Sequence, residues 1–380
     1  PPPPPPPPPP HTLLKTPPPP RTTRCTSRRQ RQMCIRDSVR AEAAATEQSP
    51  EEIAAIIARL GLKESARPVS DRPGWRKPEK VLVRAIRPEI LPALQSVAPG
   101  VELIVATTPE EAAARVGGAD VSLGFCSAEL LAAGAELRWI QTYSAGVERG
   151  VSIPALAERD VLLTNMQRVT GPVIAEHVLA MMLGFSRALN FYIPERMAGR
   201  WTRQRPDDVV MRTLAGRTVL IVGLGGIGTE VARRADAFGM RVLATRRSSR
   251  DGPDFVDRVG LPNELHAMAA EADYIVNTAP LTDATRSLFD KRFFDGSKDG
   301  AYFINVGRGG SVVQSDLVAA LRSGQIAGAG LDVTDPEPLP ADSPLWKMDN
   351  VILTPHVAAA TDLGFATGLA VVRENLRRYV

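Results

Sequence analysis

Three side chains with complementary chemistry each follow a strand-like run in the second half of the sequence. Arg308 stands between glycines, Glu337 belongs to an acidic run, and His356 ends a Thr-Pro-His segment. A guanidinium can hold a carboxylate with paired hydrogen bonds, and an imidazole that a glutamate holds can pass a proton to an adjacent oxygen. Alone, Arg308 could equally be a surface arginine, and His356 could equally be a structural histidine. Together they predict acid–base chemistry on a carboxylate-bearing substrate.

A glycine-rich turn stands upstream of these residues. The run TVLIV (218–222) leads into GLGGIG (223–228), and apolar residues at helical spacing follow. This context, a strand before and a helix after, is the one that a dinucleotide-binding motif requires. The first glycine allows a tight turn, the second lets backbone approach a pyrophosphate, and the third lets helix and strand pack closely. Five residues are therefore predicted to bind a dinucleotide: Gly223, Gly225, Gly226, Ile227 and Gly228.

The end of the next expected strand bears on which nicotinamide cofactor binds. In NAD-binding folds an acidic residue here accepts hydrogen bonds from the ribose 2′-hydroxyl. This chain has Arg246, Arg247 and Ser248 instead. Two guanidiniums and a hydroxyl can bind a 2′-phosphate, which a carboxylate would repel. We therefore expect NADP(H) to be preferred, with NAD(H) as the alternative if these arginines form only a solvated turn.

Strand-like runs alternate with helical patterns on both sides of the turn, which predicts parallel sheets with helices on both faces. The runs lie at 81–86, 101–107, 119–125, 137–144 and 161–165, then at 241–246, 274–279, 302–307, 327–333 and 350–355. Because ligands bind where parallel strands have their carboxyl ends, the turn and the three chemical residues are expected around one crevice.

Other segments suggest how the chain divides into domains. A capping box at Ser49 opens a short amphipathic helix, and a linker over 62–79 follows. Residues 171–200 read as one long apolar helix, and the last twenty residues read as a helix that packs on the first domain. The predicted substrate domain is therefore discontinuous. Its parts are residues 80–168 and 360–380, and residues 169–359 form the nucleotide-binding domain.

The first forty residues have a composition unlike the rest. They hold 14 of the 34 prolines, two of the three cysteines, and eight basic residues against one acidic residue. The remaining chain is mildly acidic, so the net charge of +4 gives no sign of a nucleic-acid partner. Residues 1–48 are expected to be a disordered low-complexity tail. The run Pro1–Pro10 conflicts with an amphipathic transit helix, which leaves a proline-rich docking arm or an artefact of the gene model.

Several classes of protein are disfavoured. Cys126 is the only cysteine after the tail, which argues against a disulfide framework and favours the reducing cytoplasm. No apolar run approaches the roughly 20 residues that span a bilayer. Scattered histidines lack the spacing of metal ligands, so no metal site is expected. Glu176 and His177, on the long helix, are interpreted as packing or interface residues.

Together, these motifs resemble the D-isomer-specific 2-hydroxyacid dehydrogenase family over about residues 100–375. The resemblance rests on segments such as AELRWIQTYSAGVE, VGLGGIG, GAYFINVGRGG and VILTPHVAAAT. The SPLW segment and the Arg-Arg pair favour the glyoxylate/hydroxypyruvate reductase branch. The resemblance implies an α/β fold with two doubly wound domains, a flavodoxin-like substrate domain and an inserted Rossmann dinucleotide-binding domain. The family continues beyond its last helix, so the end at Val380 suggests an incomplete sequence.

The resemblance also implies roles at numbered positions. Arg308, Glu337 and His356 would be catalytic, and backbone N–H groups of Ala145 and Gly146 would help to bind the substrate carboxylate. Further cofactor contacts are implied at Thr278, Ala279, Pro280, Thr285, Val306, Gly307, Arg308, Asp332, His356 and Ala358.

The predicted activity is NADPH-dependent reduction of a small 2-oxo acid, of the glyoxylate or hydroxypyruvate type, to the D-2-hydroxy acid. Hydride comes from the nicotinamide and the proton from His356. A homodimer through the helix after Gly171 is implied, with no nucleic-acid or membrane partner. The alternatives are a nicotinamide-sensing protein of the corepressor type and a phosphoglycerate-type dehydrogenase of the same fold.

Overall fold

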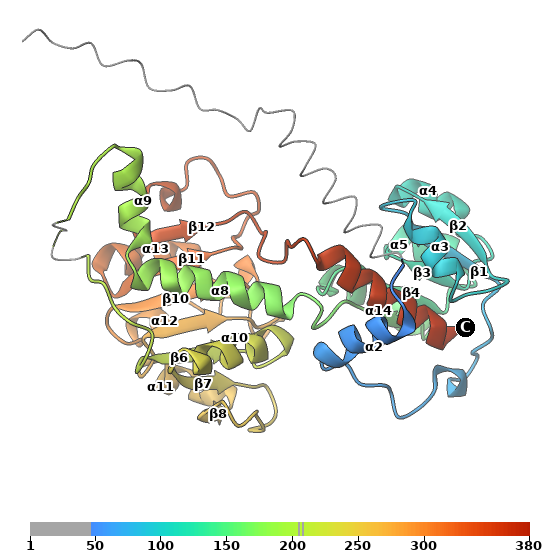
Figure 1. Cartoon of the computed structure of the whole chain (residues 1–380), viewed down its shortest axis with the longest axis horizontal. Helices are drawn as coiled ribbons and strands as arrows, with labels where there is room; N and C mark the ends of the chain where they lie inside the picture. The colour runs from blue at the N-terminus through green and yellow to red at the C-terminus, as the bar shows by residue number, and fades with distance from the viewer. Residues whose placement is uncertain (1–46, 204–205, 207–208) are drawn as a thin grey trace, which may run out of the picture.

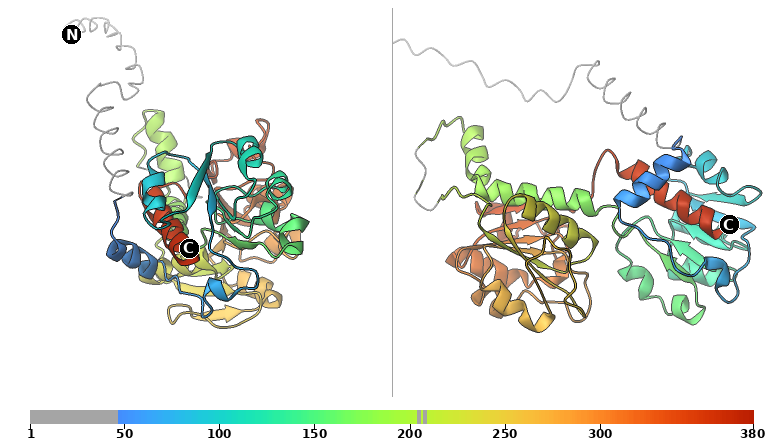
Figure 2. Two further views of the ribbon diagram at one scale, coloured as in Figure 1. Left: turned by 90° about the vertical axis from the view of Figure 1, so that its right-hand side faces the viewer. Right: turned by 60° about the horizontal axis from the view of Figure 1, so that its bottom comes forward.

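The computed structural model describes residues 47–380, apart from 204–205 and 207–208. All of the predicted tail except its last two residues therefore lies outside the described residues. The rest forms two lobes, each built on its own parallel sheet, as Figure 1 and Figure 2 show. The predicted α/β class with two doubly wound domains is confirmed.

The first sheet has five parallel strands in the order β2-β1-β3-β4-β5, which is the flavodoxin-like order. The strands are β1 (Lys80–Arg84), β2 (Glu102–Ala106), β3 (Val121–Leu123), β4 (Trp139–Gln141) and β5 (Leu162–Thr164). The helices are α3 (Ile90–Gln95), α4 (Pro109–Arg115), α5 (Ala128–Ala133), α6 (Glu148–Val151) and α7 (Pro154–Glu158). Each strand matches one of the strand-like runs but is shorter than the run, because pairing ends before the apolar pattern does.

The two ends of the described chain lie side by side on this lobe (Figure 2). Helix α2 (Pro50–Arg59) begins with the predicted capping box, in which Ser49 and Glu52 exchange hydrogen bonds. Helix α14 (Gly364–Tyr379) packs against it, and both bury apolar side chains in the core of β1 and β3. The predicted packing of the last helix is confirmed. The N-terminal helix, which the sequence left without a place, belongs to the same core.

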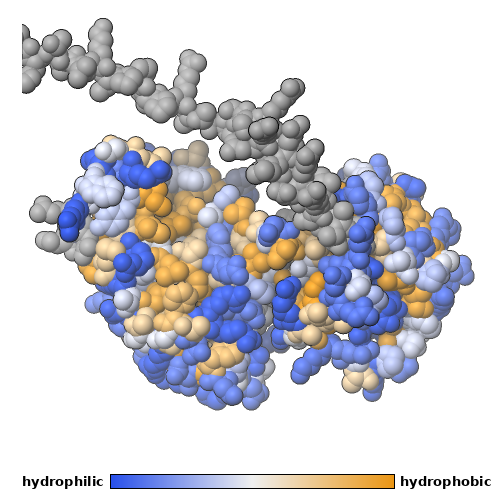
Figure 3. Space-filling view, viewed as in Figure 1, coloured by the Kyte–Doolittle hydropathy of each residue, from blue (hydrophilic) through white to orange (hydrophobic). Residues whose placement is uncertain are grey.

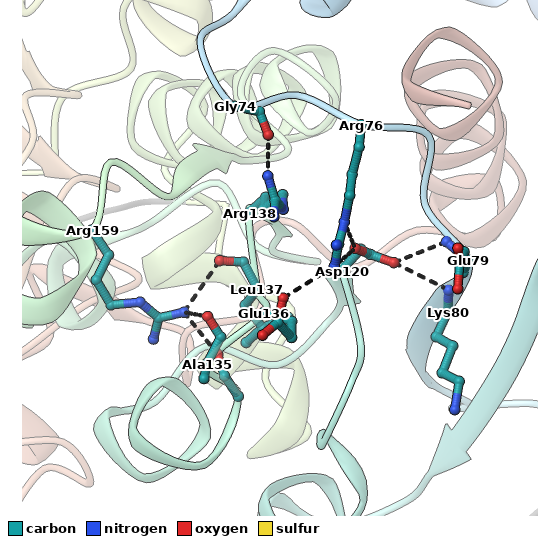
Figure 4. A network of polar contacts seen from close by, with 11 residues as sticks. Gly74, Arg76, Glu79, Lys80, Asp120, Ala135, Glu136, Leu137, Arg138 and Arg159 are labelled. Atoms are coloured by element: carbon teal, nitrogen blue, oxygen red, sulfur yellow. Dashed lines mark hydrogen bonds and ion pairs between the residues drawn. The ribbon is translucent and has the colours of Figure 1, made fainter.

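Polar contacts as well as apolar packing fix the segment between α2 and β1. It contains one short 3-10 helix, η1 (Val69–Asp71). Asp120, nearly fully buried before β3, accepts hydrogen bonds from the backbone N–H groups of Glu79 (2.8 Å) and Lys80 (3.3 Å). The Arg76 guanidinium donates to the same carboxylate at 2.9 Å (Figure 4). Because a buried carboxylate needs donors around it, this network sets where the segment joins β1.

The second sheet has seven parallel strands in the order β12-β11-β10-β9-β6-β7-β8. The strands are β6 (Thr218–Val222), β7 (Arg241–Thr245), β8 (Arg258–Gly260), β9 (Tyr274–Asn277), β10 (Ala301–Asn305), β11 (Ile326–Leu331) and β12 (Val351–Leu353). Strands β6 to β11 give the Rossmann order, and β12 extends it. The sequence did not predict β8, because Arg258–Gly260 holds a single apolar side chain and forms no apolar run.

Two layers of helices enclose this second sheet. On one face α8 and α10 pack together, and on the other face lie α11, α12 and α13. Their bounds are α8 (Gly171–Ser186), α10 (Gly226–Ala237), α11 (Leu265–Ala269), α12 (Lys291–Asp295) and α13 (Gln314–Ser323); the 3-10 helices are η2 (Pro262–Glu264), η3 (Gly309–Ser311) and η4 (Pro344–Lys347). Since both faces are covered, the ends of the strands are the places open to a ligand.

The single long helix predicted over 171–200 is wrong. Helix α8 ends at Ser186, and α9 (Leu189–Met197) follows at an angle of 74°. Ala188 between them has a φ of 53°, a left-handed conformation through which a right-handed helix cannot continue. The apolar side chains of α8 are buried against its own sheet, so no second subunit is needed to cover them.

Within the described residues, no single helix has both the length and the apolar character to cross a membrane. The bent pair of α8 and α9 meets that test only when the two are taken together, by length and composition alone.

Candidate active site

The glycine-rich turn joins β6 to α10 with the geometry that the motif predicts. Gly223 has a φ of 99°, which would strain any side chain, and a Cβ at Gly228 would clash with the Gly223 carbonyl oxygen. A Cβ at Gly225 would meet nothing within 4 Å. Open space therefore lies beside the N-terminus of α10, where the first N–H groups have no acceptor within the helix. These residues fit a dinucleotide pyrophosphate.

The two arginines after β7 have different surroundings. Arg246 is half-buried, and its guanidinium donates to the carbonyl oxygens of Leu224 (3.3 Å) and Asp251 (2.8 Å). It therefore lies against the glycine-rich turn. Arg247 and Ser248 are exposed, and within the described residues their side chains have no hydrogen bond or ion pair.

The loop after β9 also lies against the glycine-rich turn. The Thr278 hydroxyl donates to the Gly223 carbonyl oxygen at 2.6 Å, and a Cβ at Gly223 would lie 2.9 Å from the Cα of Ala279. Further along, the Thr285 hydroxyl donates to the Pro280 carbonyl oxygen at 2.6 Å and closes the loop. These predicted cofactor residues thus shape the loop through their own hydrogen bonds.

Buried amide side chains hold the loops after β9 and β10, and no motif had singled them out. Asn277 Nδ2 donates to Asn305 Oδ1 and to Ser311 Oγ, both at 2.9 Å. Asn305 Nδ2 donates to the Arg308 carbonyl oxygen at 3.1 Å. The signal was present, because both strands end in asparagine, in YIVN and YFIN. An amide both donates and accepts, so it can fix two loops at once.

The loop that carries Arg308 packs directly on the acidic loop after β11. A Cβ at Gly309 would overlap the Thr334 backbone, so only glycine allows this approach. Arg308 is half-buried, and its Nη1 donates to the Gly307 carbonyl oxygen at 2.7 Å. Val306, just before it, is buried, with 6% of its surface exposed. The structure therefore brings the Arg308 loop against the loop of Glu337.

Glu337 and His356 are in direct contact. His356 Nδ1 lies 2.9 Å from Glu337 Oε2, and Glu337 Oε1 accepts the backbone N–H of Thr334 at 3.1 Å. An ionised carboxylate only accepts, so Nδ1 carries the hydrogen and Nε2 remains for another partner. The side chains of the histidine and the glutamate are 53% and 40% exposed, which leaves the pair open to a ligand.

Asp332 is buried at the end of β11, with 3% of its surface exposed. Its carboxylate accepts from the Thr354 hydroxyl (2.6 Å) and from the backbone N–H groups of Val357 (2.9 Å) and Ala358 (3.0 Å). It therefore anchors the turn that carries His356. Its contact with the nicotinamide stays a prediction, as does that of Ala358.

Ala145 and Gly146 lie after β4, on the other sheet from the residues described above. Asn165 Nδ2 donates to the Ala145 carbonyl oxygen and Ser144 Oγ to that of Gly146, both at 2.8 Å. The N–H groups of Ala145 and Gly146 have no acceptor among the described residues. The loop thus turns its bound carbonyls away and leaves two donors for an anion.

The surroundings of Cys126 disfavour its thiolate form. Burial raises the pKa of its thiol, and the side chain is half-buried and free. A protonated thiol is a poor nucleophile. Over the described ranges, no cluster of three or more His, Cys, Asp or Glu residues could hold a metal ion.

Comparison with known proteins adds independent evidence. The family model described as D-isomer specific 2-hydroxyacid dehydrogenase, NAD binding domain, matches residues 179–358. Human glyoxylate reductase/hydroxypyruvate reductase is 39% identical over 234 residues, which cover 60% of this chain and 70% of that protein.

Two solved structures share the fold over most of the chain. A D-isomer specific 2-hydroxyacid dehydrogenase from Xanthobacter autotrophicus, in complex with NADPH and MES, is 30% identical with a TM-score of 0.69, covering 80% of this chain and 95% of that one. An NADPH-dependent glyoxylate/hydroxypyruvate reductase from Sinorhizobium meliloti, in complex with NADP and sulfate, is 30% identical with a TM-score of 0.67, covering 78% and 93%. The chain described here therefore belongs to the D-isomer specific 2-hydroxyacid dehydrogenase family of nicotinamide-dependent oxidoreductases.

Proposed function

We propose that this chain reduces a small 2-oxo acid of the glyoxylate or hydroxypyruvate type to the D-2-hydroxy acid, with NADPH as reductant. The contact between His356 and Glu337 carries the proposal, because it presents an exposed, oriented imidazole next to the loop of Arg308. Both loops follow strands of the sheet whose glycine-rich turn fits a dinucleotide. The relatives named above are reductases of such acids.

Each proposed catalytic group has one task. The Arg308 guanidinium holds the substrate carboxylate and polarises the 2-oxo group, and the N–H groups of Ala145 and Gly146 bind the same carboxylate. A bound reduced nicotinamide supplies the hydride. His356 Nε2 donates a proton to the oxygen that becomes the hydroxyl. Glu337 fixes the ring through Nδ1, and its negative charge stabilises the positively charged imidazole.

The remaining predictions about organisation stay part of the proposal. They are the domain boundaries (80–168 with 360–380, and 169–359), the other predicted cofactor contacts and the cytoplasmic location. The contacts of Thr278, Ala279 and Gly307 with the glycine-rich turn or its neighbouring loop support the cofactor assignment.

The preference for NADPH rests on Arg246 and Arg247. Arg246 lies against the turn at Leu224, and the Arg247 side chain has no partner among the described residues, which supports a role for these positive charges in binding a 2′-phosphate. Arg246→Asp should lower the ratio of kcat/KM for NADPH over NADH by roughly 10-fold to 100-fold, since it removes charge-assisted hydrogen bonds.

A nearby arginine provides the control for that measurement. Arg250 is paired with Glu264 at 2.6 Å, so Arg250→Asp should leave the cofactor ratio within about twofold. A wild-type enzyme that prefers NADH would contradict the NADPH assignment.

A homodimer would use α9 rather than the buried α8. Leu189, Ile193 and Met197 on α9 are 45%, 50% and 76% exposed, and Trp201 just beyond it is 98% exposed. Figure 3 shows apolar surface over this part of the lobe. Exposed large apolar side chains gathered in one place mark an interface. Sedimentation analysis of the wild type and of Ile193→Lys tests this assembly.

Turnover of a substrate panel tests the activity itself. NADPH oxidation should proceed with glyoxylate and hydroxypyruvate, and phenylpyruvate tests the size of the pocket. Tight cofactor binding without turnover would favour a nicotinamide sensor. Oxidation of 3-phosphoglycerate in preference to these reductions would favour the phosphoglycerate-type alternative.

A further inference from the structure

His177 is a polar exception on the buried side of α8. Its neighbours in the helix, Val178 and Leu179, lie in the apolar core, but its own side chain is 23% exposed and points to the end of β12. There its Nε2 lies 3.0 Å from Thr354 Oγ1 and 3.8 Å from Asp332 Oδ1. The preceding residue, Glu176, is 70% exposed and pairs with Arg234 of α10. The two adjacent residues therefore have different roles.

Counting hydrogens determines the direction of this chain of contacts. The Thr354 hydroxyl has a single hydrogen and donates it to Asp332 Oδ1 at 2.6 Å, because a carboxylate can only accept. Its contact with His177 must then be one in which the hydroxyl accepts. Nε2 of His177 therefore carries a hydrogen, and that hydrogen holds the hydroxyl aimed at Asp332.

Asp332 connects the Thr354 hydroxyl to the turn that carries His356. Its carboxylate binds the backbone N–H groups of Val357 and Ala358, and its carbonyl oxygen accepts the N–H of His356 at 2.8 Å. His356 has a φ of 54°, which is uncommon for a residue with a side chain. These bonds hold it in that conformation, from which the ring reaches Glu337.

We propose that His177 is a positioning residue for proton transfer. Its Nε2–H orients the Thr354 hydroxyl, which orients the Asp332 carboxylate, which holds the turn that presents His356 to the substrate. The role rests on the proposed function of His356 and adds to the reaction a residue of α8 that does not touch the substrate. Without the donor, the Thr354 hydroxyl keeps only its bond to Asp332, and the turn loses part of its restraint.

Three variants of the full chain separate positioning from packing. His177→Leu keeps an apolar side chain that fills the site but removes the N–H donor. It should lower kcat with glyoxylate and NADPH about tenfold and leave KM within twofold of the wild-type value. His177→Gln places an amide N–H near the position of Nε2 and should recover kcat to within about threefold. Glu176→Gln, the matched control, should behave as wild type, because it removes only a surface ion pair.

A variant of Thr354 tests the hydroxyl that lies between His177 and Asp332. Thr354→Val, which is nearly isosteric, should lower kcat as much as His177→Leu, and the double variant should lose little more than either single change. Thr354→Val and His177→Gln keep the test decisive if His177→Leu fails to fold. Independent losses that multiply in the double variant would overturn the proposal.

A readout without turnover distinguishes this proposal from the proposed function. Amide hydrogen exchange in peptides that cover 356–358 should speed up about tenfold in His177→Leu and stay unchanged in Glu176→Gln, with no cofactor or substrate added. If the wild type lacks reductase activity yet exchange responds, the proposed function fails and the network stands. If activity is present but leucine and glutamine at position 177 lower kcat equally, or exchange is unchanged, His177 is a packing residue.

Discussion

Two regions that follow β11 place carboxylates in opposite environments. At the end of the strand Asp332 is 3% exposed and accepts three hydrogen bonds, one from a hydroxyl and two from backbone N–H groups. In the loop beyond it the Glu337 side chain is 40% exposed and binds the His356 ring. Both act on the same histidine, Asp332 through the backbone and Glu337 through the imidazole.

The difference shows that one carboxylate, Asp332, positions the histidine, while the other, Glu337, acts on its imidazole. A buried carboxylate is tolerated only when donors satisfy it, so Asp332 makes its turn rigid at a cost that the fold must offset. A half-exposed pair contributes little to stability and remains accessible to substrate. We therefore expect changes at Asp332 to alter folding and activity together, and changes at Glu337 or His356 to alter activity alone.

The largest effect is expected for Asp332→Ala. It leaves the Thr354 hydroxyl, the buried N–H of Ala358 and the partly buried N–H of Val357 without an acceptor, which should lower the free energy of unfolding by about 3 kcal/mol. Activity measured well below the melting temperature should fall as well, because His356 loses its restraint. Urea denaturation and steady-state kinetics on the same preparation test both. Unchanged stability would show that Asp332 is not the anchor.

His356→Ala should lower kcat by about 100-fold or more, which is the usual contribution of a general acid. Because the ring is half-exposed, the free energy of unfolding should change by less than about 1 kcal/mol. Cofactor binding, followed by nicotinamide fluorescence, should persist. Activity near that of the wild type would remove His356 from the mechanism.

Sequence patterns predicted the architecture well where the signal is local or continuous. Eleven of the twelve strands in the described residues are apolar runs between turn residues, and the glycine-rich turn is defined by backbone demands at Gly223 and Gly228 that no other residue meets. The two features that the sequence did not predict also have physical reasons. The break at Ala188 has no glycine or proline to mark it, and β8 contains a single apolar residue.

The candidate site was predictable as a set of residues but not as a network. Arg308, Glu337 and His356 stand out because charged groups at strand ends suggest chemistry. Their supports, Asn277, Asn305 and Thr354, are uncharged residues whose role depends on contacts between distant segments. Nothing in the spacing of one chain reveals which hydroxyl meets which carboxylate.

The smallest effect is expected for a change at Glu337. Glu337→Gln keeps the size of the side chain, and its amide oxygen can still accept from His356 Nδ1, but the negative charge is lost. We expect kcat to fall about tenfold, because the positively charged imidazole loses the charge that stabilises it, while the free energy of unfolding changes by less than about 0.5 kcal/mol. Asp335→Asn, an exposed acid of the same loop, is the matched control and should leave both unchanged. If Glu337→Gln instead destabilises the fold as much as Asp332→Ala, the exposed pair would also be a structural anchor, and the division between the two carboxylates would be wrong.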